Sequence, residues 1–495
     1  MSDNPVTEPD VSAEHPISEH WIWAGGHRPA VPRALVESMT SNWAPAEPSR
    51  EVHPSAPFAA QRRARLAEAM PGLTLVIPTG GAKVRANDTD YRFRPGTDFF
   101  YLTGCHEPDC VLVITPGAGA GHATLYVPER RDARTHAFFT DSRYGELWVG
   151  ARRGVTEAAQ HYQIDTAPLE DLAKHLSELA DTTMAVVRGF DATLDAALEP
   201  NEHDERLVVT LGELRLVKDE FEQRQLEVAV AHTVEGFADV VRALPQATGR
   251  SERVIEGVFN LRARVEGNDV GYDTIAASGA NATVLHWTRN TGAVRPGDLL
   301  LLDAGVECDQ LYTADVTRTL PINGVFSAAQ RRVYELVLAA QDAGIAAVKP
   351  GAAFSAAHDA AVRVLAYGLA ELGILEDPED SLRPDRQTHR RYTLHGVSHM
   401  LGLDVHDCAN ARNDVYRGEL HAGYVLTVEP GLYFQANDLT VPEEYRGIGV
   451  RIEDDILVTE TGSRNLSAAL PRDPDAIEAW MAEQWRRPTP NLGLS

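Results

Sequence analysis

The sequence predicts two folded domains, an α/β domain followed by an α+β domain, and three observations support this fold class. The 495 residues are too many for one ordinary hydrophobic core. Short β-branched runs bounded by glycine and proline alternate with helical patterns in residues 55–210. Two series of helices followed by strands occupy residues 211–470, which suggests a duplicated α+β unit.

The two ends of the chain are predicted to lie outside these domains. Residues 1–54 form an amino-terminal arm that is predicted to be partly disordered, because its start is rich in proline, serine and glutamate. The aromatic segment HWIWAGG in this arm is expected to dock on a neighbouring surface and is a candidate subunit contact. The carboxy-terminal tail, residues 471–495, carries only weak structural signals.

The elements of the α/β domain follow from local patterns. AQRRARLAEAM and LEDLAKHLSELA have the apolar spacing of helices. Four runs rich in β-branched residues are predicted strands, because glycine or proline ends each of them or follows within two residues. They are LTLVIPTG, DCVLVITPG, ATLYVPE and MAVVRG.

The α+β domain begins with a long amphipathic helix over Lys218–Leu244, whose acidic first turn complements the helix dipole. Another helix opens at Ser251, and DLLLLDAG follows as a buried strand. YVLTVEP and GVRIEDDILVTE are the late strands.

Two helix starts in this domain carry serine caps. Ser327 and Gln330 form a capping box for a helix over 327–348, and Ser355 caps a helix that ends near Gly373.

Composition excludes several classes of partner. The 72 acidic and 46 basic residues give a net charge of −26, which disfavours nucleic acid and anionic membranes. The four cysteines form no CxxC pair, so we expect free thiols in a reducing cytoplasm rather than a structural zinc site. The start of the chain lacks the features of a signal peptide, and no apolar run approaches the roughly 20 residues of a membrane span. We therefore expect a soluble protein.

Carboxylates stand at the ends of apolar strands. Asp303 ends DLLLLD, and Glu429 ends YVLTVE. Asp315 lies twelve residues after Asp303 in YTADVTRTL, a short strand that can return beside the first. In GVRIEDDI, strand alternation places Glu453 on the same face as Arg451. Each residue alone would be an ordinary cap, turn or surface residue. Together, four buried carboxylates repel each other unless cations neutralise them, and their formal charge balances two divalent ions.

The segment LHGVSHMLGLDVHD holds three of the eighteen histidines, His395, His399 and His406. They could bind a metal from one face of a helix, or they could be packed and satisfied by the backbone. The segment alone leaves both interpretations open.

Several separated segments resemble, in the same order, the motifs of bacterial Xaa-Pro aminopeptidase, also called aminopeptidase P. These segments are RANDTDYRFRPGTDFFYLTGCHEPDCVLVI, GANATVLHWTRN, LLLLDAGVECDQLYTADVTRTLP, LHGVSHMLGLDVHD, LTVEPGLY and GIGVRIEDDILVTE. The resemblance covers residues 55–465. It implies an aminopeptidase P amino-terminal domain followed by a pita-bread (creatinase/aminopeptidase-like) catalytic domain.

The resemblance implies a dinuclear metal site and the residues around it. The implied ligands are Asp303, Asp315, His399, Glu429 and Glu453, of which Asp315 and Glu453 would bridge two divalent ions. Four oxygen ligands and one imidazole favour Mn²⁺ or a similar ion. The implied catalytic and substrate-holding residues are His286, His395, His406, Glu429 and Arg451. Tyr433 and Phe100 are weaker candidates.

The activity implied is release of the amino-terminal residue from peptides with proline in second position, by attack of a metal-bridging hydroxide. A prolidase restricted to Xaa-Pro dipeptides is the alternative, and a non-catalytic pita-bread protein that binds peptides is a more remote one. The family analogy also suggests a homodimer or homotetramer. A cysteine protease based on Cys408 is disfavoured, because nothing upstream supplies a helix amino-terminus for a thiolate.

One departure from the family pattern is visible. The interval between Asp303 and Asp315 is one residue longer than in the better-known bacterial members. We expect the turn VECDQLYT to absorb the extra residue as a bulge or a longer loop.

Overall fold

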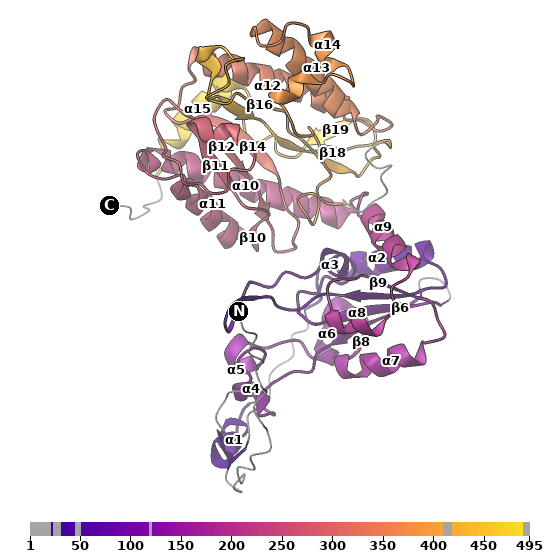
Figure 1. The fold of residues 1–495 in the computed structure, drawn as a ribbon. Coiled ribbons are helices and arrows are strands. Elements are labelled where there is room, and N and C mark those ends of the chain that lie inside the picture. Colours follow the sequence, from indigo (N-terminus) through magenta and orange to yellow (C-terminus); the bar gives the residue numbers. More distant parts are fainter. Residues whose placement is uncertain (1–20, 23–30, 45–50, 118–120, 409–417, 489–495) are drawn as a thin grey trace, which may run out of the picture. The chain divides into compact units, whose positions relative to one another are not determined.

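The computed structural model describes residues 21–22, 31–44, 51–117, 121–408 and 418–488. The chain divides into two compact units (Figure 1). The first comprises residues 1–60 and 72–199, and the second comprises residues 61–71 and 200–495. The sequence-based boundary at 210/211 falls inside helix α9, which belongs to the second unit. The polar start of the arm and most of HWIWAGG lie outside the described residues.

The first unit is built around a five-stranded mixed sheet with the strand order β8-β7-β6-β3-β9. The four predicted strands are β3, β6, β7 and β9, whereas the fifth, β8, escaped prediction because its sequence, DTAP, is short and not apolar. The strands of the first unit are β1 (Trp21–Ile22), β2 (Val31–Pro32), β3 (Thr74–Pro78), β4 (Val84–Ala86), β5 (Thr89–Asp90), β6 (Val111–Thr115), β7 (His122–Val127), β8 (Asp165–Pro168) and β9 (Met184–Val186). Its helices are α1 (Arg33–Met39), α2 (Ala56–Ala69, which continues into the second unit), α3 (Thr97–Thr103), α4 (Ala137–Thr140), α5 (Glu146–Val149), α6 (Val155–Tyr162), α7 (Leu172–Glu178) and α8 (Ala192–Ala197).

The second unit repeats one arrangement twice. A pair of packed helices, α10 and α11, precedes the antiparallel sheet β11-β12-β14, and a second pair, α12 and α13, precedes the antiparallel sheet β15-β18-β19. Its helices are α9 (Glu202–Leu214), α10 (Glu220–Ala247), α11 (Arg253–Glu266), α12 (Ala328–Ala347), α13 (Ala356–Glu371), α14 (Pro378–Leu382) and α15 (Pro474–Gln484). Its strands are β10 (Asp269–Val270), β11 (Ile275–Ser278), β12 (Leu299–Ala304), β13 (Val306–Glu307), β14 (Val316–Pro321), β15 (Val425–Val428), β16 (Gly431–Tyr433), β17 (Gly449–Arg451), β18 (Asp454–Val458) and β19 (Ser463–Asn465).

One of the two predicted serine caps is present. Ser327 and Gln330 form the expected capping box of α12. Ser355 precedes α13 as expected, but its hydroxyl contacts Asp359 Oδ2 at 3.2 Å and makes no cap hydrogen bond to the described backbone. The reason is its helical backbone conformation, φ −68° and ψ −14°, because a capping side chain is usually aimed from an extended backbone.

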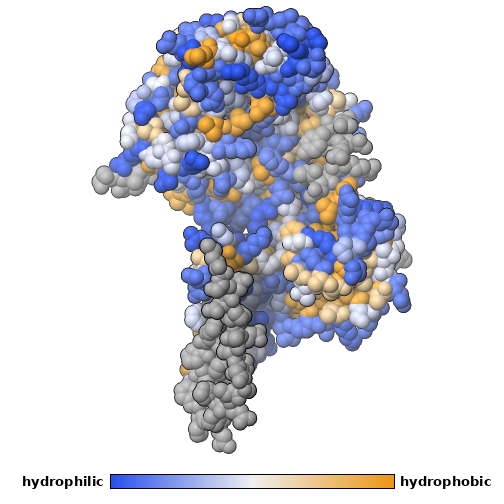
Figure 2. All heavy atoms as spheres, viewed as in Figure 1, coloured by the Kyte–Doolittle hydropathy of each residue, from blue (hydrophilic) through white to orange (hydrophobic). Residues whose placement is uncertain are grey.

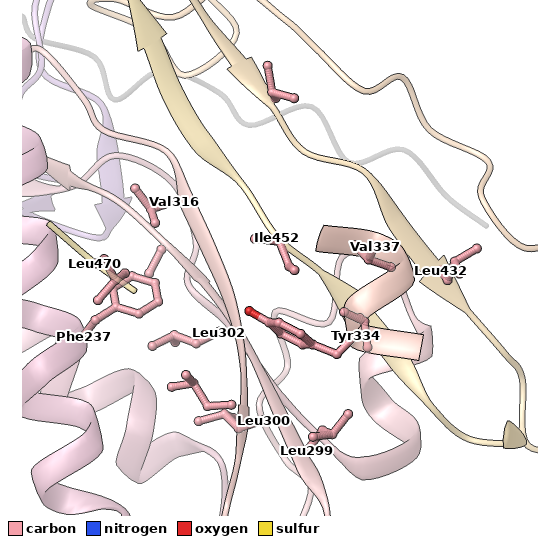
Figure 3. Packing of buried hydrophobic residues seen from close by; sticks show 14 of the residues in the cluster. Phe237, Leu299, Leu300, Leu302, Val316, Tyr334, Val337, Leu432, Ile452 and Leu470 are labelled. Carbon is pink, nitrogen blue, oxygen red and sulfur yellow. The ribbon is translucent and has the colours of Figure 1, made fainter. Parts of the chain in front are cut away.

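A single hydrophobic core joins the two halves of the second unit. In Figure 3, Leu302 on β12 lies near Phe237 of α10, whereas Tyr334 of α12 points toward Ile452. All four side chains are buried. Close packing on both faces gives the strands a defined register, and the site depends on that register.

The described surface is more hydrophilic than this core. In the view of Figure 2, hydrophilic residues cover most of the visible face of the second unit, with small apolar groups between them. In the described part of the chain, no helix combines the length and the apolar composition needed to cross a bilayer.

Arg318 on β14 is a fully buried cation that joins three segments. Its guanidinium donates to Asp454 Oδ1 at 2.7 Å, to the backbone carbonyl of Glu453 at 2.7 Å, and to the carbonyls of Leu470 and Pro471 at 3.0 Å each. A buried ion pair such as Arg318–Asp454 is stable only because its polar atoms all have hydrogen-bond partners. It ties β14 to the start of β18.

We predict that Arg318→Met destabilises the second unit by about 3–5 kcal/mol, because the buried carboxylate of Asp454 loses its closest cation. Denaturant unfolding followed by circular dichroism measures the change. The control is Arg487→Met, which removes an exposed pair with Glu483 and should leave the unfolding midpoint unchanged. Equal midpoints for the two variants would contradict this account of Arg318.

Candidate active site

A cavity of about 550 Å³ opens in the second unit. The structure brings all nine predicted site residues to its wall, although they come from segments up to 167 residues apart (453 minus 286). They are His286, Asp303, Asp315, His395, His399, His406, Glu429, Arg451 and Glu453.

The four carboxylates lie at the ends of two antiparallel strand pairs. Asp303 is the penultimate residue of β12, and Asp315 directly precedes its partner β14. Glu429 directly follows β15, and Glu453 directly precedes β18, whose last paired positions are Val428 and Asp454. Residues that flank the end of an antiparallel ladder lie side by side. Each half of the duplicated unit therefore contributes one pair of carboxylates.

The late strand GVRIEDDILVTE is two strands rather than one. Residues 449–451 pair with β16, whereas residues 454–457 pair with β15, so the chain passes from one sheet to another at Ile452 and Glu453. The backbone N–H of Glu453 donates to the carbonyl of Thr317 at 3.1 Å, and the Thr317 hydroxyl donates to Glu453 Oε2 at 2.6 Å. Arg451 and Glu453 both reach the cavity wall across this change of sheet.

The histidine segment is not helical: residues 397–401 run along β15, and residues 402–408 form bends and turns. Its backbone runs along β15, with hydrogen bonds from Thr427 N–H to His399 O at 2.9 Å and from Glu429 N–H to Val397 O at 2.8 Å. The Nδ1–H of His399 donates to the carbonyl of Met400 at 3.1 Å. That bond leaves Nε2 facing the carboxylates, 3.3 Å from Asp315 Oδ2 and 3.5 Å from Glu429 Oε1. The two interpretations of this segment are therefore compatible: one nitrogen of His399 is held by the backbone, and the other is free to act as a ligand.

Tyr272 belongs to the site and was missed by sequence reasoning. Its hydroxyl lies 2.6 Å from Asp303 Oδ1 and 2.5 Å from Asp315 Oδ1. The residue precedes β11 in a short polar segment, GYDT, which carries no motif. Only the folded chain brings it between two aspartates that follow it by 31 and 43 residues.

The turn predicted between the two aspartates contains a left-handed residue. Leu311 adopts a left-handed conformation, φ 63°, and its N–H donates to the carbonyl of Cys308 at 2.8 Å. The N–H of Cys308 donates in turn to the carbonyl of Tyr312 at 2.9 Å, which closes the turn. Asp303 and Asp315 still reach the same tyrosine hydroxyl.

Without a bound cation, the surroundings of the cavity raise the pKa values of several of its carboxyl groups. Burial raises the pKa of Asp303, and burial with repulsion from Asp315 and Glu429 raises the pKa of Glu453 well above its usual value. Burial also raises the pKa of Glu429, to about 7, although His399 opposes the shift. Burial lowers the pKa of His399, but its bond to Asp315 and the charge of Glu429 outweigh this and raise the pKa to about 9.

His395 is held in the opposite protonation state. Burial, aided by the nearby charge of Arg451, lowers its pKa to about 4, so the imidazole is neutral. Its Nδ1–H donates to the carbonyl of Gly396 at 2.7 Å, and Nε2 lies 2.7 Å from the Tyr433 hydroxyl. Arg451 donates to that hydroxyl at 2.9 Å and also forms an ion pair with Asp303. Tyr433 thus connects the histidine to the arginine.

His406 lies on the other side of the predicted ligand. Its ring meets the ring of His399 edge to face at a centroid distance of 4.3 Å, and burial and the charge of His399 lower its pKa. The next residue, Asp407, anchors this loop. Its buried carboxylate accepts from Arg215 Nε at 2.9 Å and from the N–H groups of Leu403 and Cys408. The loop that carries both histidines is therefore held by charge as well as by β15.

Two other candidates from the sequence are not among the residues that line this cavity. Phe100 is buried in the first unit, where its ring packs against His106 at 4.7 Å. Cys408 is buried, and burial with the charge of Asp407 raises the pKa of its thiol to about 12. A thiolate nucleophile is therefore disfavoured at this position, as expected.

The donor set fits divalent cations. Ligand atoms of Asp315, His399 and Glu453 all lie within 4.8 Å of one another, and Asp303 and Glu429 line the same cavity. Carboxylate oxygens with one imidazole are the ligands that Mn²⁺ and similar ions accept. A cation would also relieve the repulsion that raises the pKa values of these carboxyls.

Comparison with known proteins places this site in a family. Residues 59–187 match the aminopeptidase P amino-terminal domain, and residues 224–460 match metallopeptidase family M24. Xaa-Pro aminopeptidase 1 of Streptomyces coelicolor is 54% identical over 491 residues, which cover 97% of this chain and 98% of the relative. This chain belongs to the Xaa-Pro aminopeptidase family. Its second unit is accordingly the pita-bread fold of that family.

More distant members of the family agree over almost their full length. Xaa-Pro aminopeptidase of Escherichia coli is 35% identical, covering 86% of this chain and 97% of the relative. The structure of Escherichia coli aminopeptidase P with the inhibitor Pro-Leu has a TM-score of 0.77 and 32% identity, covering 89% of this chain and 100% of that one. Aminopeptidase PepP of Pseudomonas aeruginosa has a TM-score of 0.78 and 31% identity, covering 88% and 100%.

We predict that His399→Ala lowers the metal content of the purified protein, because the proposed site loses its only nitrogen donor. Elemental analysis after loading with Mn²⁺ and removal of free ion measures the change. The matched control is His421→Ala, an exposed histidine outside the cavity, which should bind metal as the unchanged chain does. Full metal content in His399→Ala would remove this residue from the ligand set.

Proposed function

We propose that this chain is a metal-dependent aminopeptidase that releases the amino-terminal residue from peptides with proline in second position. The observation that carries the proposal is the convergence of four carboxylates and one imidazole on one cavity, in a chain 54% identical to a named Xaa-Pro aminopeptidase over 97% of its length. Peptides with an amino-terminal Xaa-Pro sequence are the proposed partners.

Five residues are proposed to hold the metal. Asp303, Asp315, His399, Glu429 and Glu453 supply the ligands for two divalent ions, with Mn²⁺ preferred because oxygen donors dominate. When bound, such ions supply Lewis-acid polarisation of the scissile carbonyl and lower the pKa of water. The geometry of Asp315 and Glu453, which lie with His399 in the tightest group, supports their assignment as the shared ligands.

Glu429 is proposed to accept and return the proton of the attacking water. Its carboxylate lines the cavity, with Oε1 3.5 Å from His399 Nε2, so it can take a proton from water held there. Its Oε2 lies 3.4 Å from His395 Nδ1, so the two groups flank the same reacting centre. The neutral imidazole of His395 has one N–H, on Nδ1, which donates to the carbonyl of Gly396 while Nε2 accepts from the Tyr433 hydroxyl. We propose that this N–H turns from the carbonyl to a developing oxyanion during the reaction.

Arg451, His406 and His286 are proposed to orient the site and the substrate. Arg451 forms an ion pair with Asp303 and donates a hydrogen bond to the Tyr433 hydroxyl. These contacts fix the position of Tyr433, to which His395 is bonded. His286 and His406 line the cavity beside the apolar residues Leu285 and Val405. The Xaa-Pro bond is a tertiary amide with no N–H to recognise, so apolar contact with the proline ring is the interaction that this wall can offer.

Two further proposals concern the state of the protein in the cell. We propose a homodimer or homotetramer on the basis of the family resemblance. We also propose a reducing, cytoplasmic location, because all four cysteines are buried free thiols.

The proposal predicts that the Mn²⁺-loaded protein releases free Xaa from a tripeptide Xaa-Pro-Yaa and does not cleave the matched Xaa-Ala-Yaa. Amino-acid analysis of the products measures both reactions, and an Xaa-Pro dipeptide tests the prolidase alternative in the same assay. Turnover of the dipeptide alone would replace the proposal with that alternative. No release of Xaa with Mn²⁺, Co²⁺ or Zn²⁺ would overturn it.

We predict that His395→Ala lowers kcat for the tripeptide by about 10²–10⁴-fold, the range for losing a positioned donor to the transition state. Its metal content should stay near that of the unchanged chain, because both ring nitrogens are hydrogen-bonded, one to the carbonyl of Gly396 and one to the Tyr433 hydroxyl, and the five proposed ligands remain. Loss of metal from this variant would instead make His395 a ligand.

A further inference from the structure

Glu252 is a completely buried acid at the start of α11, outside the cavity. Its Oε1 accepts hydrogen bonds from the N–H of Ser278 at 2.7 Å and from Asn281 Nδ2 at 2.9 Å. Its Oε2 accepts from Trp287 Nε1 at 2.7 Å and from the N–H of Gly292 at 2.6 Å. One carboxylate therefore gathers four donors from a single segment, residues 278–292.

The four donors include both ends of that segment. Ser278 is the last residue of β11 and Gly292 lies after the segment has turned back, so the carboxylate closes a loop. The backbone adds to the closure, because Glu252 N–H donates to the carbonyl of Gly292 at 2.9 Å. A Cβ at Gly292 would lie 2.1 Å from Asn281 Nδ2 and 2.6 Å from Glu252 Oε1, so only glycine permits this approach.

The middle of this loop forms part of the cavity wall through Leu285, His286 and Thr288. Within the described residues, the imidazole of His286 has no hydrogen-bond partner, so the position of the ring depends on the backbone that carries it and on no polar contact. That backbone is supported locally by Thr288 N–H, which donates to the carbonyl of His286 at 3.0 Å. On the other side, Gln435 Nε2 donates to the carbonyl of Thr283 at 2.7 Å.

We infer that Glu252 is a positioning residue for the reaction, which acts by closing the 278–292 loop and so setting where His286 meets the peptide. The inference rests on the proposed peptidase function. Carboxylate chemistry is required because all four partners are donors, and a carboxylate offers only acceptors. A glutamine would turn an N–H₂ group toward two of those donors and leave them unpaired in a buried place.

The test uses Glu252→Gln in the full-length, Mn²⁺-loaded chain. We expect kcat/KM for Xaa-Pro-Yaa to fall by about 10–10²-fold, the cost of a small misplacement in a site, with unchanged metal content. Glu256→Gln is the matched control, because Glu256 lies one helical turn later on α11 and outside the cavity. Trp287→Phe removes one of the four donors and should give a smaller loss, which keeps the test decisive if Glu252→Gln does not fold.

A double-mutant cycle separates positioning from general damage. If Glu252 acts through His286, Glu252→Gln should reduce kcat/KM little further in a His286→Ala background. If the acid only stabilises the fold, the two losses should multiply. Multiplying losses, or an effect equal to that of Glu256→Gln, would overturn the inference.

Hydrogen exchange provides a readout that does not need activity. In Glu252→Gln the amides of residues 278–292 should exchange faster, while the remainder of α11 keeps its protection. Absence of tripeptide cleavage by the unchanged chain would defeat the proposed function, and the inference would then be judged by exchange. Unchanged protection of 278–292 would overturn it.

Discussion

The mutual repulsion of four buried carboxylates is the constraint on which the second unit depends. Asp303, Asp315, Glu429 and Glu453 face one cavity, and burial raises the pKa of three of them. A fold left to relax would separate these groups or expose them to water. The chain instead holds them together, and the cost is offset by cationic and hydrogen-bonding partners and by the affinity of such a cluster for divalent ions.

Much of the surrounding structure serves to hold this arrangement in place. Both strand pairs contribute buried side chains to the core that they share with α10 and α12, so a carboxylate can move only if the core moves. Arg318 binds the backbone at Glu453, and Arg451 pairs with Asp303. Asp407 anchors the loop of His399 through Arg215. Buried ion pairs of this kind are placed where the acidic site needs rigid support.

The protonation states of His395 and His399 follow from their burial and from the charged groups around them. His399 sits among carboxylates, which raise its pKa to about 9, whereas His395 sits beside Arg451 and has a pKa of about 4. Two histidines four residues apart therefore differ, because carboxylates raise the pKa of His399 whereas burial, aided by the charge of Arg451, lowers the pKa of His395. One suits a metal or a proton, and the other remains a neutral hydrogen-bonding group.

The sequence by itself determined the strands β3, β6, β12 and β15, the capping box of α12 and the motifs that gather the acidic residues, because these features depend on local spacing and side-chain type. The tertiary structure alone decided the division of GVRIEDDILVTE between two sheets and the roles of Tyr272, Arg318 and Glu252. Each of these residues acts through partners that lie more than twenty residues away, such as Asp454 for Arg318. Local propensity carries no information about such partners, since a buried polar group is defined by what the fold places beside it.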